Sequence, residues 1–199
     1  FTSGLVTTMR ETNAANWEEN YDFPRMQSGE VVRSIIPHER PSGMTGLVMN
    51  TRNPQFDDWR VREALIQAFN FDYINLTLNG GTEPQITSYF SNSVLGMEEG
   101  PAAGRVAEFL APFEADLLPG AMEGYALPSG EEAPANRAGI RSAMQLFEEA
   151  GYVVQDGVMT GPDGAPFTFE ILLQQGSTEN QSVVNIYVEA LERLGITPS

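Results

Sequence analysis

Residues 46–70 restrict the fold of this chain more than any other stretch, because a short apolar run there leads through a polar turn into an amphipathic helix. The segment reads GLVMNTRNPQFDDWRVREALIQAFN. Pro54 interrupts the extended run, and either Asp57 or Asp58 can accept hydrogen bonds from the free N–H groups of a helix that begins near Trp59. The apolar residues that follow at helical spacing predict one buried face: Val61, Ala64, Leu65, Ala68 and Phe69.

Extended patterns recur in the rest of the chain. β-Branched and apolar residues predict strands at 30–36, 44–50 and 166–173. An Asp-Gly pair at 156–157 lies between two apolar runs, which is the sequence pattern of a tight hairpin.

Helical patterns alternate with these strands. Asp72 is positioned to cap a short helix, and Gly80 ends that helix because glycine readily adopts the left-handed conformation. Another helix is predicted near 104–115, inside a surface segment rich in Gly, Pro and Glu. Two further apolar stripes predict helices at 138–150 and 178–194.

Together these elements predict an α/β fold, since strands and helices alternate along the chain. We expect the helices at 59–69, 138–150 and 178–194 to pack on a mixed sheet. That sheet is expected to contain strands near 44–49 and 167–173.

The end of the sequence resembles half of a crossover unit. Ile196 is apolar again after the last helix, as the first residue of a new strand would be. A crossover helix is buried only when the returning strand joins the sheet. We therefore expect residues 1–199 to form a single lobe and to be a piece of a longer protein.

Composition excludes several partners. The formal net charge is −16 and the isoelectric point is about 4.3, so a phosphate backbone is repelled and nucleic acid is not an expected partner. No apolar run approaches the roughly 20 residues that span a bilayer, so direct membrane insertion is not expected. The chain has no cysteine, which removes disulfides and thiolate chemistry.

No pattern in the sequence predicts catalytic, metal-binding or cofactor-binding chemistry. His38 is the single histidine and lies in a turn beside Pro37. Adjacent carboxylates such as Asp57-Asp58 and Glu148-Glu149 recur along the chain, but neighbours on a helix point about 100° apart and do not form an acid–base pair. Capping and solvation explain these carboxylates better.

A polar loop between the strand at 166–173 and the following helix is the predicted ligand-binding segment. In α/β sheets ligands bind outside the carboxyl ends of strands, where free helix N–H groups also point. The candidate site residues are Gln174, Gln175, Ser177, Glu179 and Asn180. The alternative is that Ser177 or Thr178 only caps the helix.

The stretch at 46–70 resembles a signature of the extracellular solute-binding proteins of family 5, the oligopeptide- and dipeptide-binding components of ABC transporters. The matching residues are Asn50-Thr51, Pro54, Phe56, Asp58, Arg60-Val61-Arg62 and Ala64-Leu65. Similar segments downstream are RSAMQLFEEAGYVVQDGVMTGPDGAPFTFEILL and YVEALERLGI. The segments YDFP, IPHERPSGMTGLVMNTR and TSYFSNSVLG are most similar to the Yej-type oligopeptide-binding branch.

This resemblance implies a lobe of the type II periplasmic-binding-protein fold, with a mixed sheet flanked by helices, from the second lobe of a two-lobed protein. It implies a peptide or peptide-like ligand, an ABC membrane permease as partner, and a periplasmic or extracellular, membrane-associated location. Arg60 and Arg62 would be structural. Two alternatives remain: a ligand-sensing domain of a regulator that uses the same lobe, and a carboxylate-based hydrolase.

Overall fold

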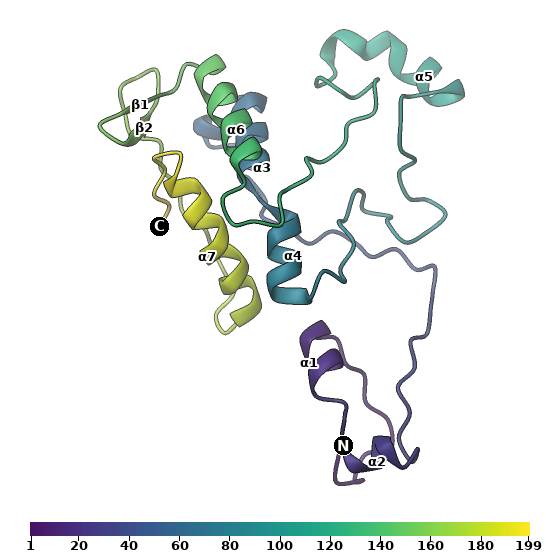
Figure 1. The fold of residues 1–199 in the computed structure, drawn as a ribbon. Coiled ribbons are helices and arrows are strands. Elements are labelled where there is room, and N and C mark those ends of the chain that lie inside the picture. Colours follow the sequence, from purple (N-terminus) through teal and green to yellow (C-terminus); the bar gives the residue numbers. More distant parts are fainter.

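The computed structural model describes the backbone of residues 1–199 and every side chain except those at 14 and 15 (Figure 1). Its α-helices are α1 (Ala14–Glu19), α2 (Pro24–Gln27), α3 (Trp59–Ala68), α4 (Phe71–Asn79), α5 (Gly104–Leu110), α6 (Arg137–Glu149) and α7 (Thr178–Glu192). The 3-10 helices are η1 (Pro54–Phe56) and η2 (Ala111–Asp116), and the strands are β1 (Val153–Gln155) and β2 (Val158–Thr160). Within these described residues, no helix combines the length and apolar character that a membrane span requires.

The buried core lies where α3, α6 and α7 meet (Figure 1). The three helices predicted at 59–69, 138–150 and 178–194 are confirmed, and their apolar stripes supply most of this core. The fully buried large side chains are Phe147, Leu65, Met159, Leu191, Leu194, Ile196 and Val61.

The ends of the helices follow from local capping chemistry. The Asp58 carboxylate accepts a hydrogen bond from the backbone N–H of Arg60 at 2.8 Å, which confirms the predicted start of α3. After α6, Gly151 has a φ of +87° and Tyr152 N–H donates to the carbonyl of Phe147 at 2.9 Å. This arrangement is a Schellman motif, which satisfies carbonyls at the end of the helix.

The predicted cap of α4 is wrong by two residues. Asn70 is the cap, since its side chain accepts from the N–H of Tyr73 at 3.3 Å. Asp72 lies inside the first turn, where its carboxylate accepts from the N–H of Gly130 at 2.7 Å. The predicted end is confirmed, because Gly80 adopts the left-handed conformation.

Among the described residues the only ladder is the β1–β2 hairpin, whose Asp-Gly turn confirms the prediction at 156–157. The strands predicted at 30–36, 44–50 and 166–173 are therefore corrected to extended or irregular chain. The physical reason is that a strand exists only through hydrogen bonds to a neighbour, and these runs have few or none. The expected mixed sheet, with strands near 44–49 and 167–173, is reduced to this small hairpin.

The segment 166–173 nevertheless lies next to β2 and to the chain end. Phe167 N–H donates to the Met159 carbonyl at 2.7 Å. Ile171 N–H donates to the Ser199 carbonyl at 2.8 Å, and Ser199 N–H donates to the Phe169 carbonyl at 3.0 Å. Ser199 therefore bonds to two residues, Phe169 and Ile171, that have one residue between them. This is the hydrogen-bond pattern of parallel strands. The chain thus runs back beside 166–173 after α7, but the strand predicted to begin at Ile196 is not formed within the described residues.

Residues 84–129, called the excursion below, leave the core and return to it (Figure 1). Both ends are held on α4. At the first end, Asn75 donates to the Glu83 carbonyl at 2.7 Å and accepts from the Glu83 N–H at 3.2 Å. At the second, Asp72 holds Gly130. The helix predicted near 104–115 is confirmed within the excursion as α5 and η2.

Candidate ligand-binding site

The predicted binding segment, residues 174–180, connects the extended run 166–173 to α7. Gly176 has a φ of +84°, which allows the chain to turn sharply there. The N–H of Ser177 donates to the Gln174 carbonyl at 3.2 Å, and α7 begins at the next residue. The segment thus lies at the end of an extended run and at a helix N-terminus, as the sequence predicted.

The candidate side chains are open to solvent. Gln174, Gln175, Glu179 and Asn180 are exposed, and Ser177 is half-buried. Within the described part of the chain none of these five side chains makes a hydrogen bond, including Ser177 at the N-cap position. Three amides and one carboxylate are therefore accessible to a ligand, and their role in binding stays a prediction.

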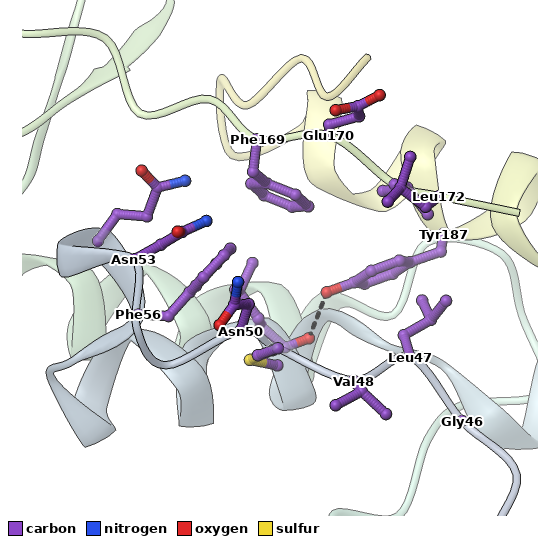
Figure 2. A pocket seen from close by; sticks show the side chains of 14 residues that line it. Gly46, Leu47, Val48, Asn50, Asn53, Phe56, Phe169, Glu170, Leu172 and Tyr187 are labelled. Carbon is purple, nitrogen blue, oxygen red and sulfur yellow. Dashed lines mark hydrogen bonds between the residues drawn. The ribbon is translucent and has the colours of Figure 1, made fainter.

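A groove of about 480 Å³ separates two extended runs, 46–50 and 169–172. Figure 2 shows the runs on opposite sides, with the rings of Phe56, Phe169 and Tyr187 between them. Phe56 and Phe169 pack edge to face with ring centroids 5.5 Å apart. Sequence reasoning missed this groove, and its only signal was the strand-like pattern of both walls.

Tyr187 connects the floor of the groove to the core. Its hydroxyl donates to the Leu65 carbonyl at 2.9 Å, the dashed line in Figure 2. Leu65 lies near the end of α3, where the N–H of Phe69 bonds to the Ile66 carbonyl instead. The Tyr187 hydroxyl therefore satisfies one of the last carbonyls of that helix.

We expect Tyr187→Phe to lower the free energy of unfolding at neutral pH by about 1–3 kcal/mol, because a buried carbonyl loses its partner. The measurement is urea denaturation followed by circular dichroism. Tyr89→Phe is the matched control, since that ring is 69% exposed. Equal stability of the two variants would contradict a role for this hydrogen bond.

The same substitution has an expected pH dependence. Burial raises the pKa of Tyr187 in the folded chain. A tyrosine in the unfolded chain ionises near pH 10, so this contribution is present below about pH 10 and is lost as the pH rises toward the folded-state value. The stability difference between Tyr187→Phe and the unmodified chain should therefore shrink above pH 10.

The arginines at the start of α3 brace the turn that leads into it. Arg60 pairs with Asp58 at 2.6 Å, and this hydrogen bond holds the pKa of the Asp58 carboxyl below its usual value. Arg62 donates to the carbonyls of Phe56 and Asp57, each at 2.7 Å. Both arginines are thus structural. The residues that the structure describes contain no group of three or more His, Asp or Glu side chains placed to hold a metal ion.

The sequence model of one protein family, the bacterial extracellular solute-binding proteins, family 5 Middle, matches residues 1–199. The chain belongs to this family. This membership confirms the expected fold class, α/β of the type II periplasmic-binding-protein kind, of which the chain contains the helices and one small sheet.

Three proteins of known sequence are similar to this family 5 chain. A putative binding protein of Brucella melitensis is 34% identical over 98% of the chain and 32% of its own length. The peptidoglycan-binding protein YepA of Agrobacterium fabrum is 32% identical over 93% of the chain and 30% of its own length. The probable peptide-binding protein YejA of the same organism is 31% identical over 98% and 32%. The Yej-type branch is confirmed, and the chain spans about a third of the length of these relatives.

Proposed function

We propose that this family 5 chain is one lobe of a substrate-binding protein that captures oligopeptides or peptide-like compounds for an ABC importer. The match of the family over the whole chain carries the proposal. Two of the three relatives are named for a ligand: YepA for peptidoglycan and YejA for peptides, and peptidoglycan itself contains short peptides. The partner would be the importer's membrane permease, and the protein would act in the periplasm or outside the cell.

The exposed segment 174–180 has suitable chemistry for such ligands. Side-chain amides donate and accept hydrogen bonds, as the backbone of an extended peptide does. Glu179 adds a carboxylate in the first turn of α7. In this proposal the ligand lies in a cleft between the chain and an opposing lobe. The wall that the chain contributes consists of Gln174, Gln175, Ser177, Glu179 and Asn180.

The proposed protein binds its ligand and does not convert it chemically. Asp58 is engaged by Arg60, and His38 accepts a hydrogen bond from the nearby Arg40 N–H in an exposed loop. A screen of the chain with chromogenic peptide and ester substrates should therefore give no rate above the buffer. Reproducible turnover would support the hydrolase alternative.

Nuclear magnetic resonance gives a direct test of the site. We expect the side-chain amide signals of Gln174, Gln175 and Asn180 to shift when tri- to pentapeptides are added. One wall leaves half of the ligand hydrated, and association itself costs roughly 4–15 kcal/mol. The dissociation constant should accordingly lie in the millimolar range, about −4 kcal/mol.

The amide of Gln145 is the internal control, because it is already bonded to Glu149 at 2.8 Å on α6. Its signal should stay in place throughout the titration. A parallel titration with stem peptides from peptidoglycan distinguishes the two kinds of ligand named for the relatives. If only the NMR signals of residues outside 174–180 shift, the proposed binding site is wrong.

A further inference from the structure

The elements that build the proposed binding segment carry acidic charges only. The sequence has no lysine, and none of its arginines lies between Arg62 and Arg105 or between Arg141 and Arg193. Helix α4, the β1–β2 hairpin, the extended run before the segment, the segment itself and all of α7 fall within these two intervals. Because α4 and α7 pack against each other (Figure 1), the two acidic intervals adjoin in space.

The charge of Glu179 has no partner within the described residues. The side chain is exposed in the first turn of α7 and forms no ion pair there. The residues three and four positions further along the helix, Ser182 and Val183, carry no charge. The first arginine after it is Arg193, about 21 Å further along the helix at about 1.5 Å per residue. This distance exceeds the Debye length of roughly 8 Å at physiological ionic strength, and Arg193 itself donates to the Pro134 carbonyl.

A ligand on this segment therefore meets charge of one sign. The neutral amides of Gln174, Gln175 and Asn180 can bond to a peptide backbone whatever the charge of its side chains. The Glu179 carboxylate attracts a cationic side chain and repels an acidic one, and an exposed pair of this kind changes a binding constant by up to about fivefold. The amides thus supply tolerant binding, and the carboxylate supplies a preference.

We propose that the segment 174–180 selects its ligands by charge. It favours peptides with an ammonium or guanidinium group beside Glu179 and disfavours peptides with a carboxylate there. The Glu179 carboxylate accepts charge-assisted hydrogen bonds from the cationic group. Further acidic side chains such as Glu170, which is exposed in the run before the segment, extend the preference to longer ligands. This inference rests on the proposed function, since it names the ligand class of the same site.

A second role of Glu179 has to be separated from this one. A carboxylate in the first turn of a helix also stabilises the helix, because the free N–H groups there carry partial positive charge. That role alone predicts that neutralising Glu179 lowers the stability of the chain and leaves the order of ligand affinities unchanged. The test must therefore compare ligands that differ only in charge.

The probes are three alanine pentapeptides with free termini and with lysine, glutamine or glutamate at the central position. The dissociation constants come from NMR titrations that follow the side-chain amides of Gln174, Gln175 and Asn180. At about 0.01 M salt we expect the lysine peptide to bind about fivefold more tightly than the glutamine peptide, and the glutamate peptide about fivefold more weakly. At about 1 M salt, where the Debye length is about 3 Å, the three constants should agree within about twofold.

Glu179→Gln should remove most of this preference. The ratio of the glutamate to the lysine dissociation constant at low salt should fall from about 25-fold to about threefold. Glu148→Gln is the matched control, because it changes the net charge equally and lies exposed in the last turn of α6, next to the hairpin. Its ratio should stay within about twofold of that of the unmodified chain.

Equal affinity for the lysine and glutamate peptides at low salt would overturn the proposal. So would an equal loss of preference in both variants, because net charge and not Glu179 would then be responsible. The glutamine peptide tests the proposed function separately, since its side chains are neutral. If it shifts the three amides while the charged peptides bind equally, only the charge selection is wrong. If no peptide shifts them, the binding site itself is wrong.

Discussion

Replacing Phe147 by alanine should lower the free energy of unfolding by about 3–5 kcal/mol, the usual cost of deleting a buried aromatic ring. Phe147 is fully buried on α6. Its ring centroid lies 5.7 Å from that of Tyr152 and 5.4 Å from that of Phe167, so it joins the helix to the hairpin and to the extended run. A loss of this size is a large part of the stability of a typical domain.

Phe109→Ala provides the matched comparison, since the same ring on α5 is 74% exposed. Its unfolding midpoint in urea should remain within the error of the unmodified chain. If Phe147→Ala fails to fold, Phe147→Leu can be measured instead, and its free energy of unfolding should lie between those of the alanine variant and the unmodified chain. Similar midpoints for the Phe109 and Phe147 variants would show that the core described here does not stabilise the chain.

The second large effect is expected at Gly139, and its sign opposes helix propensity. Alanine in a helix interior is favoured over glycine by about 1 kcal/mol. A Cβ atom at position 139 would, however, lie 2.3 Å from the Gln67 carbonyl and 2.5 Å from the Asn136 amide nitrogen. The close approach of α6 to α3 therefore requires glycine. We expect Gly139→Ala to destabilise the chain by about 1–3 kcal/mol, the range for overpacking.

Gly46→Ala is the control for this substitution, because a Cβ atom there meets no atom within 4 Å. Its effect on the urea midpoint should be small. A stabilising effect of Gly139→Ala would mean that α3 and α6 separate freely, contrary to the packing described above.

The helices could be predicted because their signals are local. The stripe that begins at Val61, the cap at Asp58 and the glycine stop at 151 each involve residues within a few positions of one another. The error at α4 was also local: Asn70 and Asp72 are both suitable caps, and only the position of the first helical turn decides between them.

The strands and the groove could not be predicted with the same success, since both depend on distant neighbours. The run 46–50 has the composition of a strand, but no described segment pairs with it. The run 166–173 pairs only in part: residues 166–167 bond to β2, and Phe169 and Ile171 bond to Ser199. For the candidate site, the exposure of 174–180 followed from its polar composition, whereas the groove required the spatial meeting of two remote runs.

The attachment of both ends of the excursion to α4 bears on how this family can diverge. Because Asn75 and Asp72 fix those ends close together, the helix already constrains the loop, and doubling its length adds only about 0.6 kcal/mol of closure entropy. We therefore expect insertions and deletions between 84 and 129 to disturb the core little, provided that they keep Tyr125, whose hydroxyl donates to Glu63 of α3 at 2.9 Å.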